Sequence, residues 1–248
     1  MRTGRFAWRR WAALTAVSIT LPSLAAAATA PPDLTGVWTS YGARNISTGS
    51  DDPGFPLNFR PDAKVKVDEY RALVAPKGET PGGVCLGYGM PWSMLGSGGY
   101  PMEIVQRPEQ ITVIYELHGE TRRVYFGARN APPEDRVPGR NGYSSGRWDG
   151  DALVVETDNL VEQVDQRVPH SGNAKIVERY WLEKEKDKEG RRILNVEMTM
   201  TDPDFYPAPV VTRRQWAQVP NGRVLPYECG EEVWRKRLEE LAAARKPR

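Results

Sequence analysis

Short runs of β-branched and aromatic residues, separated by polar residues, glycine and proline, fill most of the chain after residue 100. Such runs between turn residues are typical of β-strands. Asp149-Gly150 stands between two of them and favours a type I′ hairpin turn. The predicted strands are Asp33 to Thr39, Met102 to Gln106, Gln110 to His118, Glu120 to Gly127, Ser145 to Trp148, Ala152 to Thr157, Ala174 to Leu182, Ile193 to Asp202 and Val210 to Gln218.

Helical spacing of apolar residues occurs in only two places. Pro61 to Val74 has apolar residues three or four apart, with Pro61 suited to a helix start and Pro76 and Gly78 suited to its end. Glu231 to Arg245 has the pattern of an amphipathic helix. The chain is therefore predicted to be mainly β, with one short helix near 62–74 and a C-terminal helix.

Many short strands with few helices favour a single antiparallel barrel, with a β-sandwich as the alternative. Gly36-x-Trp38 and Gly146-x-Trp148 each place an indole at a strand start, where it can close one end of a barrel. This arrangement resembles the Gly-x-Trp opening of lipocalin-like (calycin) barrels. We expect the fold of that class.

Three long segments, 42–61, 82–100 and 129–145, lack periodicity and are predicted to be loops. Loops of this length in compact domains are often binding loops or lids. Met90, Trp92 and Tyr100 in the middle loop are candidate ligand-binding residues, because exposed apolar side chains would be costly in water. We expect a pocket under Gly82 to Tyr100, with His170 and Tyr143 at its rim.

The N-terminus has the pattern of an export signal. Arginines without acids precede an apolar run, Trp11 to Leu24, which is shorter than the roughly 20 residues needed to span a bilayer, and small residues follow. We expect 1–28 to be a signal peptide and 29–248 a single barrel domain that is periplasmic or secreted. A retained N-terminal anchor is the alternative.

Charge excludes one class of partner. The chain has 34 Lys and Arg against 32 Asp and Glu, but four of the arginines lie in the expected signal, which leaves 30 bases against 32 acids. A nearly neutral chain is not expected to bind nucleic acid, which needs clustered Lys and Arg. No segment after the signal is apolar enough to span a membrane, and the oligomeric state cannot be predicted.

Cys85 and Cys229 are the two cysteines of the chain. An even number of cysteines in an exported protein favours a disulfide, and two buried free thiols are the alternative. A bridge would close a loop of roughly 145 residues, for which the chain-entropy model gives about 4–5 kcal/mol.

Several phrases along the chain resemble a widespread family of secreted bacterial proteins of uncharacterised function. The phrases that carry this resemblance are Asp33 to Trp38, Cys85-x4-Met90-Pro91, Pro101 to Gln106, Arg122 to Tyr125, Ser145 to Asp151, Leu153 to Val155, Pro169 to Ser171, Val177 to Arg179 and Tyr227 to Cys229. The resemblance implies a lipocalin-like barrel and no particular reaction. At Tyr143 this chain departs from many members, which have His or Asp there.

Motifs for cofactors and metals are missing. The sequence has two histidines, His118 and His170, and no HExxH, P-loop, Gly-x-Ser-x-Gly or suitably placed GxGxxG motif. We therefore expect neither a cofactor nor a bound metal.

The remaining candidates for chemistry are few. His170 lies in a polar loop and could act as base or acid near neutral pH, and Glu103 interrupts an apolar run, where an inward carboxylate would have a raised pKa. A supporting histidine and an outward glutamate are the alternatives. Arg123 and Tyr125 share one face of a strand and could bind an oxygen of the substrate or pair within the sheet. Tyr143 is the third catalytic candidate.

Two functions fit these residues, and a structural envelope protein, with no cavity large enough for a ligand of roughly 300 Å³, is a third interpretation of the chain. The first is a cofactor-independent enzyme (lyase, isomerase, hydratase or cyclase) that acts on a small hydrophobic or aromatic molecule through His170 and Glu103. The second is a non-catalytic, lipocalin-like protein that binds an apolar small molecule. An acid–base pair within hydrogen-bond reach inside the fold would distinguish the first from the second.

Overall fold

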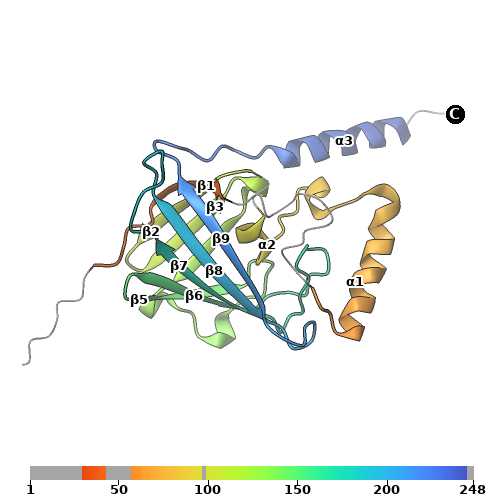
Figure 1. The fold of residues 1–248 in the computed structure, drawn as a ribbon. Coiled ribbons are helices and arrows are strands. Elements are labelled where there is room, and N and C mark those ends of the chain that lie inside the picture. Colours follow the sequence, from red (N-terminus) through yellow and green to blue (C-terminus); the bar gives the residue numbers. More distant parts are fainter. Residues whose placement is uncertain (1–29, 43–56, 97–98, 245–248) are drawn as a thin grey trace, which may run out of the picture. The chain divides into compact units, whose positions relative to one another are not determined.

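The computed structural model describes residues 30–42, 57–96 and 99–244 (Figure 1). The predicted signal peptide and most of the predicted loop 42–61 lie outside these residues. The helices and strands of the described residues all lie in the compact unit Pro31–Arg248.

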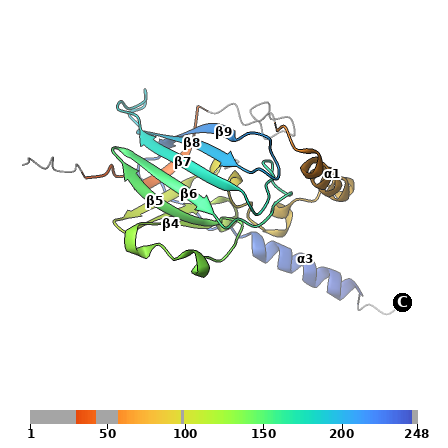
Figure 2. The same cartoon turned by 90° about the horizontal axis from the view of Figure 1, so that it is seen from below.

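A closed barrel is the main feature of the described residues, where nine strands each pair with the next and the last pairs with the first (Figure 2). The strands are β1 (Gly36–Tyr41), β2 (Met102–Arg107), β3 (Gln110–Tyr115), β4 (Thr121–Tyr125), β5 (Tyr143–Asp149), β6 (Ala152–Asp158), β7 (Lys175–Leu182), β8 (Ile193–Thr201) and β9 (Val210–Gln218). The prediction of a mainly β barrel is confirmed.

The prediction of a wholly antiparallel barrel is wrong at one place. β4 and β5 pair in parallel, through Val124 with Ser144 and Tyr125 with Ser145, and the other pairs are antiparallel. A parallel pair cannot be joined by a tight turn, because the chain must return to the start of the second strand. Residues 126–142 make this return, which explains the long loop that the sequence has there.

Alternating side chains build the barrel core. In β3, Ile111, Val113 and Tyr115 are buried, while the residues between them are partly exposed. Trp38 of β1 is fully buried, and its indole Nε1 donates a hydrogen bond to the Leu34 carbonyl at 3.0 Å. Period two in the sequence therefore corresponds to inward and outward faces.

The α-helices of the described residues are α1 (Pro61–Val74), α2 (Trp92–Leu95) and α3 (Cys229–Ala244). α1 has the predicted bounds, with Pro61 at a first-turn position that needs no backbone N–H donor. Its Ala63 and Val67 are buried. No helix in the described part of the chain is long and apolar enough to cross a membrane.

The middle loop packs into the core. Residues 88–96, which we call the plug, include Met90 and Met94, both fully buried, and Trp92, which is 6% exposed. Backbone carbonyls of the plug accept hydrogen bonds from side chains that are distant in the sequence. Gln163 Nε2 donates to the Tyr88 carbonyl at 2.6 Å, and Gln166 Nε2 donates to the Met90 carbonyl at 2.9 Å. The plug is thus both buried and hydrogen-bonded to residues far away in the sequence.

Cys85 and Cys229 form a disulfide with their Cα atoms 5.5 Å apart. The predicted pairing is confirmed. It ties the segment just before the plug to the first residue of α3.

Candidate functional site

The parallel pair leaves an opening beside the barrel wall. β4 and β5 share only two residue pairs, and the connecting residues 126–142 pass along their outer side, with short turns of 3₁₀-helix at Gly127–Arg129 and Pro133–Asp135. Between them lies a groove of about 480 Å³, which we call the β4–β5 groove. Its lining residues are Thr121, Arg122, Arg123, Tyr125, Arg129, Ala131, Asp135, Val137, Asn141, Gly142, Tyr143 and Ser144.

Three of the predicted site residues meet in this groove. Arg123 and Tyr125 alternate along β4 with the buried Arg122 and Val124, so they point outward into the groove, and Tyr143 joins them from the first position of β5. The prediction that Arg123 and Tyr125 share one face is confirmed. Arg123 is exposed, and no described residue forms a hydrogen bond or ion pair with its guanidinium.

The two tyrosines form a fixed aromatic wall. The rings of Tyr125 and Tyr143 are stacked with centroids 5.4 Å apart and an angle of 26° between planes. The Tyr143 hydroxyl accepts a hydrogen bond from the Ala131 N–H at 2.6 Å, and the Arg136 guanidinium lies 4.6 Å from its ring centre. Arg136 is itself held by Asp158 at 2.9 Å. The wall is therefore set before any ligand arrives.

Behind the groove, a buried polar network fills part of the barrel. Arg122 donates to Ser144 Oγ at 3.0 Å and to Thr157 Oγ1 at 2.7 Å, and it binds both carboxylate oxygens of Glu178. The Tyr180 hydroxyl donates to Glu178 Oε1 at 2.6 Å. Burial is the largest single influence and lowers the pKa of the Arg122 guanidinium, but Glu178, together with Tyr180 and Tyr115, raises this pKa on balance. Burial also raises the pKa of Tyr180, and Glu178 adds to this rise.

His170 lies elsewhere and is fully buried. Its Nδ1 is 2.9 Å from the Ser171 carbonyl and its Nε2 is 3.1 Å from the Met90 carbonyl. Burial lowers the pKa of this imidazole, although the two carbonyls act in the opposite direction. The ring thus holds the plug, and the predicted place at the rim of an open pocket is not what the structure shows.

Glu103 does not join His170. In β2 the buried Met102 and Ile104 point inward, and Glu103 between them lies on the outer face, half-buried. Among the described residues no hydrogen bond or ion pair links Glu103 to His170. The expected inward carboxylate is absent, because its strand follows the strict alternation of its apolar neighbours.

The expected pocket under the middle loop is almost closed. Trp92 and Tyr100 line a space of about 10 Å³ together with Tyr115 and Glu120, which is room for one water at most. Met90 lies in the core. The Arg167 guanidinium lies over Trp92, 5.1 Å from the centre of its ring. The rings of Tyr100 and Tyr227 meet edge to face, with their centres 5.7 Å apart. The loop does lie next to His170, as predicted, but as a packed plug.

Sequence reasoning missed several polar residues that shape these regions. Glu120 accepts hydrogen bonds from the Gly89 N–H at 2.9 Å and the Ser93 hydroxyl at 2.5 Å, and Arg140 donates to the Gly87 carbonyl at 2.7 Å. No motif marks these residues, because their partners, backbone groups among them, lie 27 to 53 positions away in the sequence. Clusters of His, Cys, Asp or Glu that could hold a metal ion do not occur in the described ranges.

No model of a known protein family matches the chain, and no curated protein matches it. The resemblance to a secreted bacterial family therefore has no support from these comparisons. What the described residues define is a closed, mixed β-barrel with a groove where its one parallel strand pair opens.

Proposed function

We propose that this protein binds a small molecule with an anionic oxygen next to a flat ring, and that it does so in the β4–β5 groove. The single observation that carries the proposal is the position of Arg123, exposed and without a partner among the described residues, beside the stacked rings of Tyr125 and Tyr143. A guanidinium recognises a carboxylate through two parallel hydrogen bonds, and a tyrosine ring offers a face or edge for stacking.

The electrostatics of the groove support an anionic ligand. Three arginines and one aspartate are among its lining residues. Glu178 neutralises Arg122, and Glu109 lies 3.8 Å from Arg129, so Arg123 is the cation left to a ligand. A groove of about 480 Å³ is in the size range of small-molecule sites.

A binding role fits the geometry better than acid–base catalysis. The His170 imidazole contacts the Met90 carbonyl of the plug, and Glu103 faces outward from the barrel. The two residues therefore do not form the acid–base pair that the enzymatic hypothesis requires. The carboxylate among the groove's described lining residues is Asp135, and histidine does not occur in this lining. The alternative hypothesis, a binding protein, remains, with the ligand changed from purely apolar to aromatic and anionic.

We also propose that the protein works outside the cytoplasm. The signal-like N-terminus and the disulfide between Cys85 and Cys229 support this location, since disulfides persist in oxidising compartments.

Isothermal titration with para-hydroxybenzoate tests the proposal, and para-hydroxybenzamide is the matched neutral probe. We expect the acid to bind more tightly than the amide, with an affinity that falls as salt is added. Arg123→Ala should weaken binding of the acid by roughly 10- to 100-fold, since a hydrogen bond to a charged group contributes about 1.5–3 kcal/mol. It should leave the weak binding of the amide nearly unchanged.

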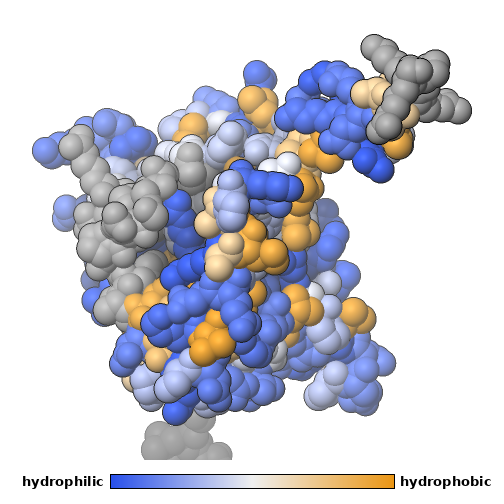
Figure 3. Space-filling view, turned by 90° about the vertical axis from the view of Figure 1, so that its right-hand side faces the viewer, coloured by the Kyte–Doolittle hydropathy of each residue, from blue (hydrophilic) through white to orange (hydrophobic). Residues whose placement is uncertain are grey.

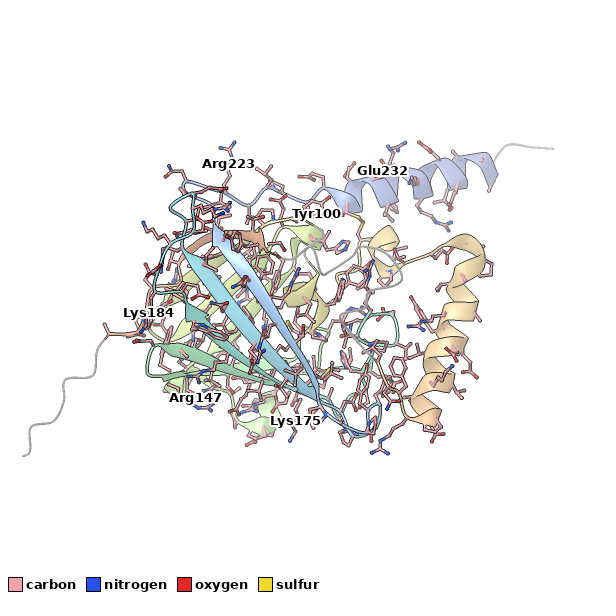
Figure 4. All side chains as sticks on the ribbon, viewed as in Figure 1. Tyr100, Arg147, Lys175, Lys184, Arg223 and Glu232 are labelled. Carbon is pink, nitrogen blue, oxygen red and sulfur yellow. A yellow bond between two sulfur atoms is a disulfide. The ribbon has the colours of Figure 1, made fainter. Side chains whose placement is uncertain are left out.

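Arg147→Ala is the control variant. Arg147 is an exposed arginine of the neighbouring strand β5, labelled in Figure 4, and it pairs with Glu156 outside the groove. The Arg147→Ala variant should bind para-hydroxybenzoate with the same affinity as the unaltered protein. Equal affinity for acid and amide, or an equal loss in both variants, would count against the groove as an anion site.

A further inference from the structure

α3 is an amphipathic helix whose apolar side is uncovered. None of its residues is buried, and Trp234, Leu238 and Leu241 are 56%, 48% and 43% exposed. Spacings of four and three residues place them on one stripe of the helix. Figure 3 shows hydrophobic groups open to the surface on this helix, and in Figure 1 it extends away from the strands.

The disulfide holds the start of this helix in place. Cys229, its first residue, is joined to Cys85, and the neighbours of Cys85 are also exposed apolar residues: Val84 is 66% and Leu86 42% exposed. Apolar surface is therefore concentrated on both segments that the disulfide joins. Concentration of this kind marks a surface that binds a partner.

We propose that α3 pairs with α3 of a second copy of this chain, in an antiparallel arrangement with a two-fold axis at Leu238. The proposal concerns assembly and is independent of the β4–β5 groove. Around such an axis Leu238 meets Leu238 of the other copy. Trp234 lies four residues before the axis, and the small Ala242 lies four residues after it on the same side of the helix. The indole of each copy thus finds room beside the alanine of the other.

Charge favours this occupant and this direction. Arg235 and Glu239 lie on one flank of the stripe, one before Leu238 and one after it. An antiparallel partner brings Arg235 of one copy to Glu239 of the other, and the two-fold axis repeats this pair. The two helix dipoles then lie side by side in opposite directions, which is favourable. α3 carries four glutamates against three basic residues, which disfavours an anionic lipid surface as the alternative occupant.

The charged side chains of α3 can exchange their partners within the helix for partners in a second copy. Arg235 donates to Glu239 at 2.6 Å and to Glu232 at 2.7 Å within the helix, but these side chains are about half exposed or more. Glu232 is labelled on the outer surface of α3 in Figure 4. Exposed pairs contribute little to stability, so exchanging an internal for an intermolecular pair costs little.

Sedimentation equilibrium on the disulfide-bonded chain tests the proposal over micromolar to submillimolar concentrations. We expect a monomer–dimer equilibrium, and at least a tenfold weaker dimer for Leu238→Glu and for Trp234→Glu. Lys236→Glu is the control, because Lys236 lies on the opposite side of the helix. None of these three side chains is buried, so circular dichroism should show the same folded barrel in every variant.

Leu238→Cys adds a test of direction. Oxidation should link two copies of Leu238→Cys but not of Trp234→Cys, because in the antiparallel arrangement Trp234 faces Ala242 of the other copy, whereas a parallel pair would link both variants. Lys236→Cys should yield no linked dimer in either arrangement. An unaltered protein that stays monomeric at every concentration would overturn the proposal, as would a dimer that survives Leu238→Glu. Monomeric protein that binds phosphatidylglycerol vesicles through Trp234 would overturn it too and assign α3 to a lipid surface.

Discussion

Arg122 and Glu178 form an ion pair with two parallel contacts inside the barrel, in which Arg122 Nη1 is 3.1 Å from Glu178 Oε1 and Nη2 bonds to Oε2. Their side chains are 1% and 0% exposed. Ser144 and Thr157 accept further hydrogen bonds from Arg122, and Tyr180 donates one to Glu178. A buried charge pair depends on such additional hydrogen bonds, so the whole network should respond to the loss of one member.

Glu178→Gln tests this dependence. The substitution leaves the Arg122 charge buried without a counter-charge, and we expect it to lower the free energy of unfolding by about 3–5 kcal/mol. Urea denaturation followed by circular dichroism measures the change. Glu197→Gln is the matched control on β8: its partner Arg213 is 77% exposed, and the loss should be about 0–1 kcal/mol. A Glu178→Gln loss no larger than the control's would show that the pair does not stabilise the fold.

The strands could be predicted because each one carries its own pattern. Period two along β4 puts Arg122 on the same side as Val124, and along β7 it puts Glu178 on the same side as Ile176 and Tyr180. The inward position of both charged side chains therefore follows from the alternation in the sequence. Their pairing does not, because it joins residues 56 positions apart and depends on the closure of the barrel.

The site could be predicted only in part, for a related reason. Arg123 and Tyr125 follow from local alternation, but the groove that contains them exists because β4 and β5 run in parallel. We expected only antiparallel neighbours. His170 was misplaced because a polar loop favours exposure, whereas here the imidazole is buried against the Met90 carbonyl of the plug.

Gly142 lines the groove in a conformation that constrains what can replace it. Its φ is +62°, and an added Cβ would lie 2.5 Å from the Asp158 carbonyl oxygen. Gly150, in the hairpin turn between β5 and β6, has a φ of +58° but nothing within 4 Å of an added Cβ. The two glycines thus share the backbone strain and differ in the space around them.

Gly142→Ala should therefore destabilise the protein more than Gly150→Ala. We expect about 1–2 kcal/mol for Gly150→Ala from the left-handed backbone alone. Gly142→Ala should lose about 1–3 kcal/mol more, because overpacking adds to the same strain. Urea denaturation of both variants measures the difference. Equal losses would mean that the backbone next to Asp158 yields without cost.

Removal of the disulfide should destabilise the barrel as a whole. Cys85 and Cys229 are 144 residues apart, so their bond restricts most of the unfolded chain. The chain-entropy model predicts a loss of about 4–5 kcal/mol for Cys85→Ser with Cys229→Ser. Thermal or urea unfolding measures it, and the reduced unaltered protein should match the double variant. A loss below about 1 kcal/mol would show that the bridge restrains only α3 and the segment around Cys85.

The two histidines should make stability depend on pH near neutrality. Burial is the largest cause that lowers the pKa of His170, and it also lowers the pKa of His118. A lowered pKa in the folded state means that the unfolded chain binds more protons once the pH falls below about 6.5. The stability that the neutral imidazoles contribute is therefore complete above that pH and is lost as the pH falls through the folded-state pKa values.

His170→Gln separates the contribution of the plug from that of His118. A neutral imidazole has one N–H for two carbonyl neighbours, and glutamine keeps a donor for one of them without titrating. We expect the unaltered protein to lose stability between about pH 7.5 and pH 5.5, His170→Gln to lose less over the same interval, and His118→Gln to show the share of the other histidine. Urea denaturation at each pH gives the three slopes. If His170→Gln had the slope of the unaltered protein, His170 would bind its proton as readily in the folded state as in the unfolded chain. That result would contradict a fully buried, neutral imidazole against the Met90 carbonyl.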